Sequence, residues 1–199
     1  MKYIIAFIGK AGAGKDTIAT ELVKQNPDWN MIVSCTTRPR REGEVDGVNY
    51  HYLTNEEFAQ KVLNGDMLEA TFFNDWHYGT MASSLYEGVN VGVFNPEGYD
   101  CLKEMLPKDI RVVGFYVKAD DKTRMLRQLN RETNPDVREI VRRFTADEED
   151  FYDIDNDPDY PVNIINNNSG MNILQIVSAL NEFLHPIVSS GRKSLENWA

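Results

Sequence analysis

A glycine-rich segment near the N-terminus constrains the fold of this chain more than any other feature. Residues 9–17 read GKAGAGKDT, and they lie between an apolar, β-branched run at 3–8 (YIIAFI) and a segment with helical spacing of apolar residues at 17–25 (TIATELVKQ). The G-x-x-x-x-G-K spacing curls the backbone so that successive N–H groups point inward at phosphate oxygens, and the positive end of the following helix faces the same point. A buried strand, this turn and a helix, in that order, predict an α/β fold that binds a nucleoside triphosphate.

Each residue of this phosphate loop is a candidate ligand of the triphosphate. We expect Lys15 to reach the terminal phosphates and to take part in catalysis. A hydroxyl normally follows the lysine directly and holds Mg²⁺; Asp16 intervenes here, so Thr17 is the expected magnesium residue. The alternative is a glycine-rich turn that only caps a helix, and the flanking strand and helix argue against it. The candidate ATP-binding residues of the loop are Gly9, Lys10, Ala11, Gly12, Ala13, Gly14, Lys15, Asp16 and Thr17.

The rest of the chain completes an alternating pattern of strands and helices. Apolar runs that suit buried strands recur at 31–34, 89–94, 111–117 and 162–165. Helical composition covers 122–151 with a break at the proline of 133–135, and an amphipathic helix is expected at 173–184. Residues 36–84 instead alternate in short segments with charged turns, which is typical of a small antiparallel lobe. We predict a mostly parallel sheet, and we expect the chain after Pro186 to be poorly ordered.

The net charge of −10 does not decide which ligands the chain binds, because the charges are unevenly placed. Eight of the 31 acidic residues lie between residues 147 and 159, and nine of the eleven arginines lie within 38–41 and 124–143. An acidic balance argues against DNA or RNA as a polymer, since basic residues dominate such binding, but not against nucleotides. We expect the run at 147–159 to be a solvated loop that can balance neighbouring arginines; Pro158 stands where a calcium loop needs glycine.

The number of cysteines and the hydropathy of the chain indicate the cellular compartment in which we expect it. Cys35 and Cys101 are too few for a disulfide framework and lack the spacing of metal ligands, so we expect small buried thiols in a reducing environment. No stretch approaches the ~20 apolar residues of a membrane-spanning helix, and the N-terminus leads directly into the phosphate loop. We therefore expect a cytoplasmic chain whose partners are small molecules, with neither a membrane nor a nucleic acid polymer among them.

A second informative segment, residues 34–50, reads SCTTRPRREGEVDGVNY. Arg38 and Arg41 present forked donors that suit another phosphate, and Tyr50 adds a neutral phenol donor. Taken alone, these residues could also form a surface turn with solvated arginines. The whole segment, however, closely resembles the guanylate kinase motif S-x-T-T-R-x-x-R-x-G-E-x-x-G-x-x-Y.

The resemblance continues with MLE at 67–69 and HYGT at 77–80, and it covers roughly residues 2–184. It implies a guanylate-kinase-type nucleoside-monophosphate kinase that transfers the γ-phosphate of ATP to GMP or dGMP with Mg²⁺. It also implies two groups of substrate-binding residues: Arg38, Arg41, Tyr50 and Tyr78 for the acceptor phosphate, and Ser34, Glu69 and Thr80 for the base.

The base-reading role of Glu69 agrees with the chemistry of guanine. Guanine presents the N1–H and N2–H donors side by side, and one ionised carboxylate can accept both. Adenine offers N1 as an acceptor and would leave buried Glu69 oxygens unpaired, at a cost of about 1–3 kcal/mol. In isolation, Glu69 could equally be a solvated strand residue.

Two departures from the family pattern leave alternatives open. The family usually carries D-x-D after the acceptor lobe, where this sequence reads VFN at 93–95; Glu44 and Glu97 are candidate replacements, and Glu44 is a candidate substrate contact. The G-K-D-T loop is similar to those of phage-type deoxynucleoside-monophosphate kinases. A broader kinase for dGMP, dTMP and modified dCMP is therefore one alternative. An inactive guanylate-kinase-like protein-interaction domain is another, although such domains typically lose the phosphate loop.

The arginine-rich region at 124–145 resembles the family's lid, which closes over the donor triphosphate and excludes water. By this resemblance Arg127, Arg131 and Arg143 are candidate catalytic residues, whereas Arg124 and Arg138 are expected to face solvent. The alternative is a solvated helix with ion pairs. Asn166 matches a family asparagine near the donor adenine, and its alternative is a strand-end turn residue.

The resemblance also sets the expected domain organisation. It implies an α/β P-loop kinase core with a mostly parallel five-stranded sheet flanked by helices, plus a small antiparallel acceptor-binding lobe and a helical lid. We expect a single domain at 1–185, with its core at 1–33, 85–123 and 146–185, the acceptor-binding lobe at 34–84, the lid at 124–145, and a C-terminal tail at 186–199.

Overall fold

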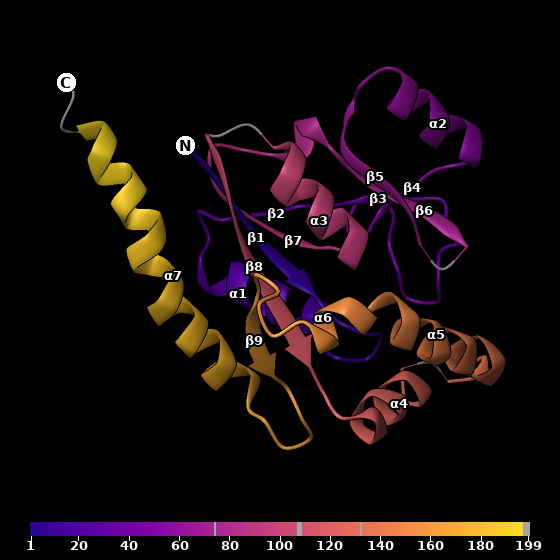
Figure 1. Cartoon of the computed structure of the whole chain (residues 1–199). Coiled ribbons are helices and arrows are strands. Elements are labelled where there is room, and N and C mark those ends of the chain that lie inside the picture. The colour runs from indigo at the N-terminus through magenta and orange to yellow at the C-terminus, as the bar shows by residue number, and fades with distance from the viewer. Residues whose placement is uncertain (74, 107–108, 132, 197–199) are drawn as a thin grey trace.

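Five parallel strands form the main sheet, in the order β2-β7-β1-β8-β9 (Figure 1). The structure is a computed structural model, and it describes residues 1–73, 75–106, 109–131 and 133–196. The strands of this sheet are β1 (Lys2–Ile8), β2 (Asn30–Met31), β7 (Gly88–Val93), β8 (Ile110–Lys118) and β9 (Asn163–Asn166). The predicted α/β fold with a parallel five-stranded sheet is confirmed.

Helices cover both faces of this sheet. They are α1 (Lys15–Gln25), α3 (Pro96–Met105), α6 (Tyr152–Asn156) and α7 (Ile173–Glu196). Successive side chains of a strand point to opposite faces, so β1 feeds two apolar cores. Its odd-numbered side chains pack with α1 and α7, and its even-numbered side chains pack with α3 and α6. The central strand is thereby buried on both sides, and it leads directly into the phosphate loop at the carboxyl edge of the sheet.

A second, four-stranded sheet lies beside the first and has the order β4-β3-β6-β5 (Figure 1). Its elements are β3 (Cys35–Thr36), β4 (His51–Tyr52), β5 (Met67–Phe73) and β6 (Trp76–Met81), with a 3₁₀ turn at Ala82–Ser84. The pairs β3–β6 and β5–β6 are antiparallel, as predicted, but β3 and β4 run parallel. The sheet is therefore mixed, because a loop of more than ten residues separates β3 from β4 and returns the chain in the same direction.

Besides α6, which replaces part of an expected loop, two helices have no counterpart in the sequence-based expectations. The first is α2 (Asn55–Leu63), which begins at a capping box formed by Thr54 and Glu57. The second is α3, which begins after Asn95 with Pro96 in its first turn. Both helices begin at recognisable capping residues, but each is too short for its apolar residues to form a clear helical period.

The helical region at 122–151 forms α4 (Asp121–Leu129) and α5 (Val137–Asp150), on either side of the predicted break. The expectation of a loop at 147–159 is wrong for most of that run, which ends α5 and forms α6, although its acidic residues other than Asp147 are exposed. The expectation that the run balances neighbouring arginines is confirmed, because Asp147 and Glu148 pair with Arg124. Its carboxylates pair with buried or half-buried cations, since Glu148 and Asp155 both lie 2.9 Å from the Lys10 Nζ. These ion pairs hold the run in helices against the core.

The expected disorder directly after Pro186 is also not found, because α7 continues through this proline to Glu196; residues 197–199 of the expected tail lie outside the described residues. Ile187 and Val188 pack against the apolar core, and the Tyr3 hydroxyl donates to the Ile187 carbonyl at 3.3 Å. Packing beyond the proline thus sustains the helix where the sequence suggests a stop. Within the described ranges, the structure contains no helix that is both long and apolar enough to cross a membrane.

Candidate functional site

A cavity of about 820 Å³ opens where the phosphate loop, the second sheet and helices α4 and α5 meet. It is the meeting point of three sets of residues that the sequence analysis placed in different segments of the chain. The predicted site residues that line it are Gly9, Ala11, Gly12, Gly14, Lys15, Asp16, Thr17, Ser34, Arg38, Arg41, Glu44, Tyr50, Glu69, Tyr78, Arg127, Arg131 and Arg143. Four predicted residues are not in its lining, namely Lys10, Ala13, Thr80 and Asn166.

Two positions of the phosphate loop, Gly12 and Gly14, accept only glycine, because of their backbone conformation and because neighbouring atoms leave no room for a Cβ atom. Gly12 and Gly14 have positive φ angles of 79° and 94°, which side-chain-bearing residues rarely adopt. A Cβ atom on Gly12 would lie 2.5 Å from the Arg124 carbonyl oxygen, and one on Gly14 would lie 2.5 Å from the Asn167 Nδ2 atom. The loop is therefore pressed against its neighbours, and α1 begins directly after it at Lys15.

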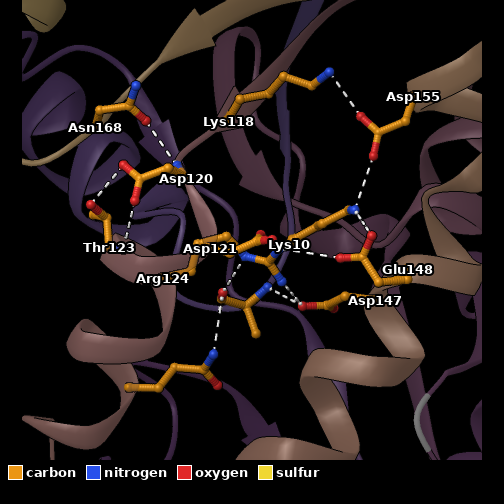
Figure 2. A network of polar contacts seen from close by, with 12 residues as sticks. Lys10, Lys118, Asp120, Asp121, Thr123, Arg124, Asp147, Glu148, Asp155 and Asn168 are labelled. Carbon is orange, nitrogen blue, oxygen red and sulfur yellow. Dashed lines mark hydrogen bonds and ion pairs between the residues drawn. The ribbon is translucent and has the colours of Figure 1, made fainter.

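The Lys10 side chain points away from the main cavity. Its Nζ atom lies 2.9 Å from both Glu148 and Asp155 (Figure 2). Lys10 lines a separate small cavity of about 170 Å³. Burial alone would lower the pKa of Lys10, but the two carboxylates raise it above its ordinary value. The Lys10 ammonium is thus neutralised within the protein rather than aimed at the cavity.

Glu44 organises the predicted acceptor-phosphate residues. Both of its oxygens accept from Arg38 Nη2 at 2.9 Å, and its Oε2 atom also accepts from the Arg41 backbone N–H at 2.8 Å and the Tyr52 hydroxyl at 2.7 Å. Arg131 approaches the same carboxylate at 3.5 Å. A carboxylate with this many donors is committed to holding arginines, so it is a poor candidate for a magnesium ligand.

Four guanidinium groups surround this end of the cavity. Burial, together with the positive charges of Arg143, Arg38 and Arg131, lowers the pKa of Arg41 to about 10 against the opposing effect of Glu44. Burial likewise lowers the pKa of Arg143, although Glu139 counteracts it. The Arg143 Nε atom is buried and has no hydrogen-bond partner among the described residues, although the Glu139 carboxylate lies 3.3 Å away. Four neighbouring positive charges that repel one another favour an anion between them.

The lining of the cavity also contains the buried carboxylate Glu69 and small polar residues. The Glu69 side chain is 7% exposed, and burial raises its pKa to about 7, with the Thr80 hydroxyl opposing the shift. The Ser34 and Thr80 hydroxyls lie 3.4 Å apart behind it. A Cβ on Gly98 would come within 3.1 Å of Glu69 Oε2, so the first turn of α3 closes the pocket tightly around this carboxylate.

Two further polar residues in this pocket were not assigned a role from the sequence. The Asn95 Nδ2 group donates to the Thr71 hydroxyl at 2.7 Å, and the Asn95 Oδ1 atom accepts the Gly98 N–H at 2.7 Å. Thr71 lies two residues after Glu69 on β5, so strand periodicity would have placed both side chains on one face. Glu97, the other candidate replacement for the missing acid, is exposed and does not line the cavity.

The predicted lid arginines take different positions. Arg127 donates to the carbonyl oxygens of Gly12 and Ala13 at 3.3 and 3.1 Å and to that of Asn167 at 2.9 Å, so it braces the phosphate loop. The Arg131 side chain is 54% exposed and therefore able to meet a ligand. Arg138 is exposed, as predicted.

The prediction that Arg124 faces solvent is wrong, because its side chain is only 2% exposed. Arg124 lies three residues before Arg127 on α4, and this spacing puts the two on one helix face toward the loop. Its charge is met by Asp147 at 2.8 Å, and its guanidinium lies 4.5 Å from the Phe144 ring centroid.

Near the end of β9, the structure places Asn167, rather than Asn166, against the phosphate loop. The Asn166 side chain is exposed, whereas Asn167 is 5% exposed and its Nδ2 group donates to the Ala13 carbonyl at 2.8 Å. Alternation along a strand does not specify which residue turns inward once the strand has ended. The sequence therefore could not distinguish Asn166 from Asn167 as the residue that faces the loop.

The donor set around the start of α1 suits a magnesium ion that enters with a nucleotide. Asp16 and Thr17 are exposed at the first turn and line the cavity. Mg²⁺ prefers oxygen ligands, usually keeps several waters and is held by one or two protein oxygens together with substrate phosphates. Within the described ranges, no group of three or more His, Cys, Asp or Glu side chains could hold a metal without such phosphates.

Comparisons with known proteins identify the relatives of this chain. The guanylate kinase family model matches residues 1–185. The guanylate kinase of Chlorobium luteolum is 39% identical over 109 residues, which are 52% of this chain and 55% of that protein. The guanylate kinase of Clostridioides difficile is 33% identical over 148 residues, which are 72% of this chain and 71% of that protein.

Several relatives are thus matched over about half of their length; in Clostridium perfringens guanylate kinase the matched part is 43% of the protein, at 48% identity. The crystal structure of guanylate kinase from Anaplasma phagocytophilum shares the fold, with a TM-score of 0.64 over 93% of this chain and 86% of that one, at 18% identity. Because the family model spans nearly all of the described residues, the chain belongs to the guanylate kinase family.

Proposed function

We propose that the protein transfers the γ-phosphoryl group of ATP to GMP or dGMP and releases ADP and the nucleoside diphosphate. The observation that carries this proposal is one cavity with three chemically distinct parts. Its lining contains the phosphate loop, four guanidinium groups and a buried carboxylate. These three groups suit a donor triphosphate, two phosphates that meet, and a base that offers hydrogen-bond donors.

The base end supports guanine. An ionised Glu69 accepts two parallel N–H donors, and the Ser34 hydroxyl, which lines the cavity, can donate to an adjacent carbonyl oxygen. The Thr80 hydroxyl lies 3.4 Å from that of Ser34, outside the cavity lining, and can orient it. A pyrimidine is shorter than guanine and would leave the buried carboxylate without partners, which is costly in a closed pocket. We assign residues 34–84 as the acceptor-binding lobe on these grounds.

The acceptor phosphate would be held by Arg38, Arg41, Tyr50 and Tyr78. Arg38 is held in place by Glu44, so its remaining donors are oriented before a ligand arrives. The Tyr50 phenol stays neutral near pH 7, because burial raises its pKa, and it can donate a hydrogen bond to a phosphate oxygen. Preorganised donors of this kind lower the cost of bringing two anions together.

Transfer needs no covalent intermediate on the protein. Lys15 would contact the terminal phosphates, and Arg131 and Arg143 would neutralise charge on the group in flight. We assign residues 124–145 as a lid whose closure keeps water from accepting the phosphoryl group. When bound with ATP, Mg²⁺ supplies charge neutralisation across the phosphates, and the Thr17 hydroxyl is the residue we expect to hold it.

We also propose a cytoplasmic location with ATP and the monophosphate as the partners. Cys35 and Cys101 are free thiols, which suits a reducing compartment. Cys35 is buried, and burial raises the pKa of its thiol to about 11, so it is not a reactive thiolate at neutral pH.

A substrate panel tests the proposal. ADP release would be measured with ATP and Mg²⁺ against GMP, dGMP, AMP, dTMP and dCMP, with kcat/KM for the two guanine nucleotides expected to be at least 100-fold above the others. Glu69→Gln should lower kcat/KM for GMP by about tenfold or more, since one buried acceptor is lost. Comparable rates on pyrimidine nucleotides would replace guanine specificity with a broader deoxynucleoside-monophosphate kinase. No ADP release with any acceptor would mean a binding domain rather than a kinase.

A further inference from the structure

A buried ion pair joins the two helices of the lid at the start of the phosphate loop. Arg124 on α4 places its Nη2 atom 2.8 Å from the Oδ2 atom of Asp147 on α5, and the two side chains are 2% and 4% exposed (Figure 2). Asp121 and Glu148 flank the same guanidinium at 3.1 and 3.5 Å. A pair this deeply buried is costly unless its remaining donors and acceptors find partners, so its other contacts matter.

Those contacts are the two backbone groups of one loop residue. The Ala11 N–H donates to Asp147 Oδ2 at 2.7 Å, and the Ala11 carbonyl accepts from Arg124 Nε at 3.1 Å and from Gln128 Nε2 at 3.4 Å. Ala11, Asp147 and Arg124 therefore form a closed ring of hydrogen bonds. Both polar groups of the Ala11 backbone are thus bonded to side chains of the lid helices.

The next residues of the loop lean on the same helix. A Cβ on Gly12 would come within 2.5 Å of the Arg124 carbonyl oxygen, and Arg127 donates to the Gly12 and Ala13 carbonyls. The first half of the phosphate loop thus lies directly on α4. Its shape depends on where that helix is held, and the buried Arg124–Asp147 pair helps to hold the helix against α5.

We infer that Arg124 and Asp147 are positioning residues, which set the conformation of the phosphate loop through the Ala11 backbone and so determine affinity for the donor triphosphate. The inference rests on the proposed function for the identity of the donor. The pair has no net charge, so it does not attract the anion itself. Asp147 lines the cavity, and Arg124 cancels a carboxylate that would otherwise repel phosphate beside the loop.

A competing interpretation makes different predictions. A carboxylate that accepts a loop N–H could occupy the place of a phosphate oxygen and leave when the nucleotide binds. The Asp147 side chain would then be an internal competitor, and its removal would tighten binding. The closed ring with Arg124 and Ala11 favours a permanent contact, because departure of Asp147 would strand a buried guanidinium.

The test is a charge-neutral double variant, Arg124→Met with Asp147→Ala, which removes the ring and leaves no unpaired buried charge. The Kd of a non-hydrolysable ATP analogue and the KM for ATP are each expected to rise about tenfold, as for one or two lost hydrogen bonds, while the KM for GMP stays within twofold. The matched control is Arg138→Met with Glu149→Ala, two exposed positions on α5 with the same charge change and wild-type values expected.

A measurement on the wild-type protein keeps the inference open to refutation should the double variant not fold. In ¹⁵N-alanine-labelled protein without nucleotide, the Ala11 amide is expected to exchange with solvent at least tenfold more slowly than an unbonded amide, and to remain protected when the ATP analogue binds. Free exchange of Ala11 without ligand would overturn the inference, as would loss of its protection on binding.

Two outcomes with the variants would also overturn it. Wild-type affinity for the ATP analogue in the double variant would reduce the pair to a stabilising contact, and tighter binding would make Asp147 a competitor. Failure of the proposed function would give a different result from failure of this inference. The wild-type protein would phosphorylate no monophosphate, while the exchange rate of the Ala11 amide would still report on its hydrogen bond to Asp147.

Discussion

Glu69 and Arg41 face the same cavity, and burial acts on them in opposite directions. Burial raises the pKa of the Glu69 carboxyl to about 7, and it lowers the pKa of the Arg41 guanidinium to about 10. In both cases the charged form is disfavoured in the ligand-free protein. A ligand that offers donors to the one and negative charge to the other would relieve both penalties at once.

Glu69 should make substrate recognition depend on pH. Below pH 7 a growing fraction of the free protein carries a protonated Glu69, which cannot accept two guanine donors. The kcat/KM for GMP should therefore fall about 15-fold between pH 7 and pH 5.5. Glu69→Gln should flatten this limb of the profile, and the KM for ATP should change little across the range. A GMP profile that stays flat in the wild-type protein would argue against the assignment of Glu69 to the base.

The Glu69 carboxyl also makes the free energy of unfolding depend on pH, with stability lost as the pH rises. Its pKa in the folded state is about 7 against an ordinary value of 4.5, so the folded protein binds this proton more tightly than the unfolded chain. The stabilising contribution is complete below pH 4.5 and is lost as the pH rises through 7. The difference in melting temperature between Glu69→Gln and wild type should therefore shift in favour of the variant between pH 5 and pH 8, measured by calorimetry.

Arg41→Met should separate stability from function. Removing one of four neighbouring cations relieves repulsion in the ligand-free protein, so the melting temperature should rise or stay level rather than fall. The acceptor phosphate loses a charge-assisted contact, so the KM for GMP should rise by roughly 10- to 100-fold with the KM for ATP nearly unchanged. Calorimetry and steady-state kinetics on the same preparation check both parts. An unchanged KM for GMP would remove Arg41 from the acceptor site.

At the scale of elements, the phosphate loop shows why the spacing of a few residues can predict a site. Its glycines are required by the left-handed backbone and by backbone contacts closer than a Cβ allows, so few other residues could serve at Gly12 and Gly14. The strand that precedes the loop and the helix that follows it are predictable because their apolar patterns flank the motif directly. The motif residues Arg38, Arg41 and Tyr50 also line the cavity. The loop that carries them folds around Glu44, which accepts hydrogen bonds from Arg38 and from the Arg41 backbone.

Other elements cannot be predicted from the sequence in this way. β3 and β4 contain two residues each, too few for a periodic pattern. The acidic run 147–159 resembles a solvated loop because its partners, Lys10, Lys118 and Arg124, lie far away in the chain. Long-range ion pairs of this kind have no local signature, so neither the burial of Arg124 nor the ends of α5 and α6 follow from the sequence pattern.

A pair of glycine variants tests the close approach of the loop to α4. Gly12 and Gly43 both have positive φ angles, of 79° and 78°, but a Cβ on Gly43 would meet nothing within 4 Å. Gly43→Ala should therefore cost about 1 kcal/mol of backbone strain. Gly12→Ala adds an overlap with backbone that cannot rotate aside, so it should cost at least about 2 kcal/mol and abolish ATP binding. Urea unfolding of both variants gives the comparison, and equal costs would contradict the contact.

For the whole molecule, acidic and basic side chains are unevenly distributed around the cavity. Acidic side chains of α5 and α6 neutralise the cations behind the phosphate loop. Among the four clustered guanidiniums, those of Arg38 and Arg131 contact Glu44, whereas that of Arg143 pairs with Glu139. Two ion pairs cross from the lid to the second sheet, Arg142 with Asp75 at 3.2 Å and Arg131 with Glu44 at 3.5 Å. The part of the cavity around Arg38, Arg41, Arg131 and Arg143 is therefore locally positive inside a chain of net charge −10.

This uneven distribution predicts how substrate binding responds to salt. At 0.1 M ionic strength the screening length is about 10 Å, so an approaching monophosphate responds to the nearby arginines more than to acids elsewhere on the surface. The KM for GMP should thus rise severalfold between 0.05 and 0.5 M KCl, whereas attraction governed by the net charge would make it fall. Glu182→Gln removes an exposed acid on α7 and should leave the KM for GMP and its salt dependence unchanged, because α7 packs on the sheet face that carries α1, away from the cavity lining. A KM that falls with added salt would show that the global charge, rather than the arginine cluster, controls the approach of the acceptor.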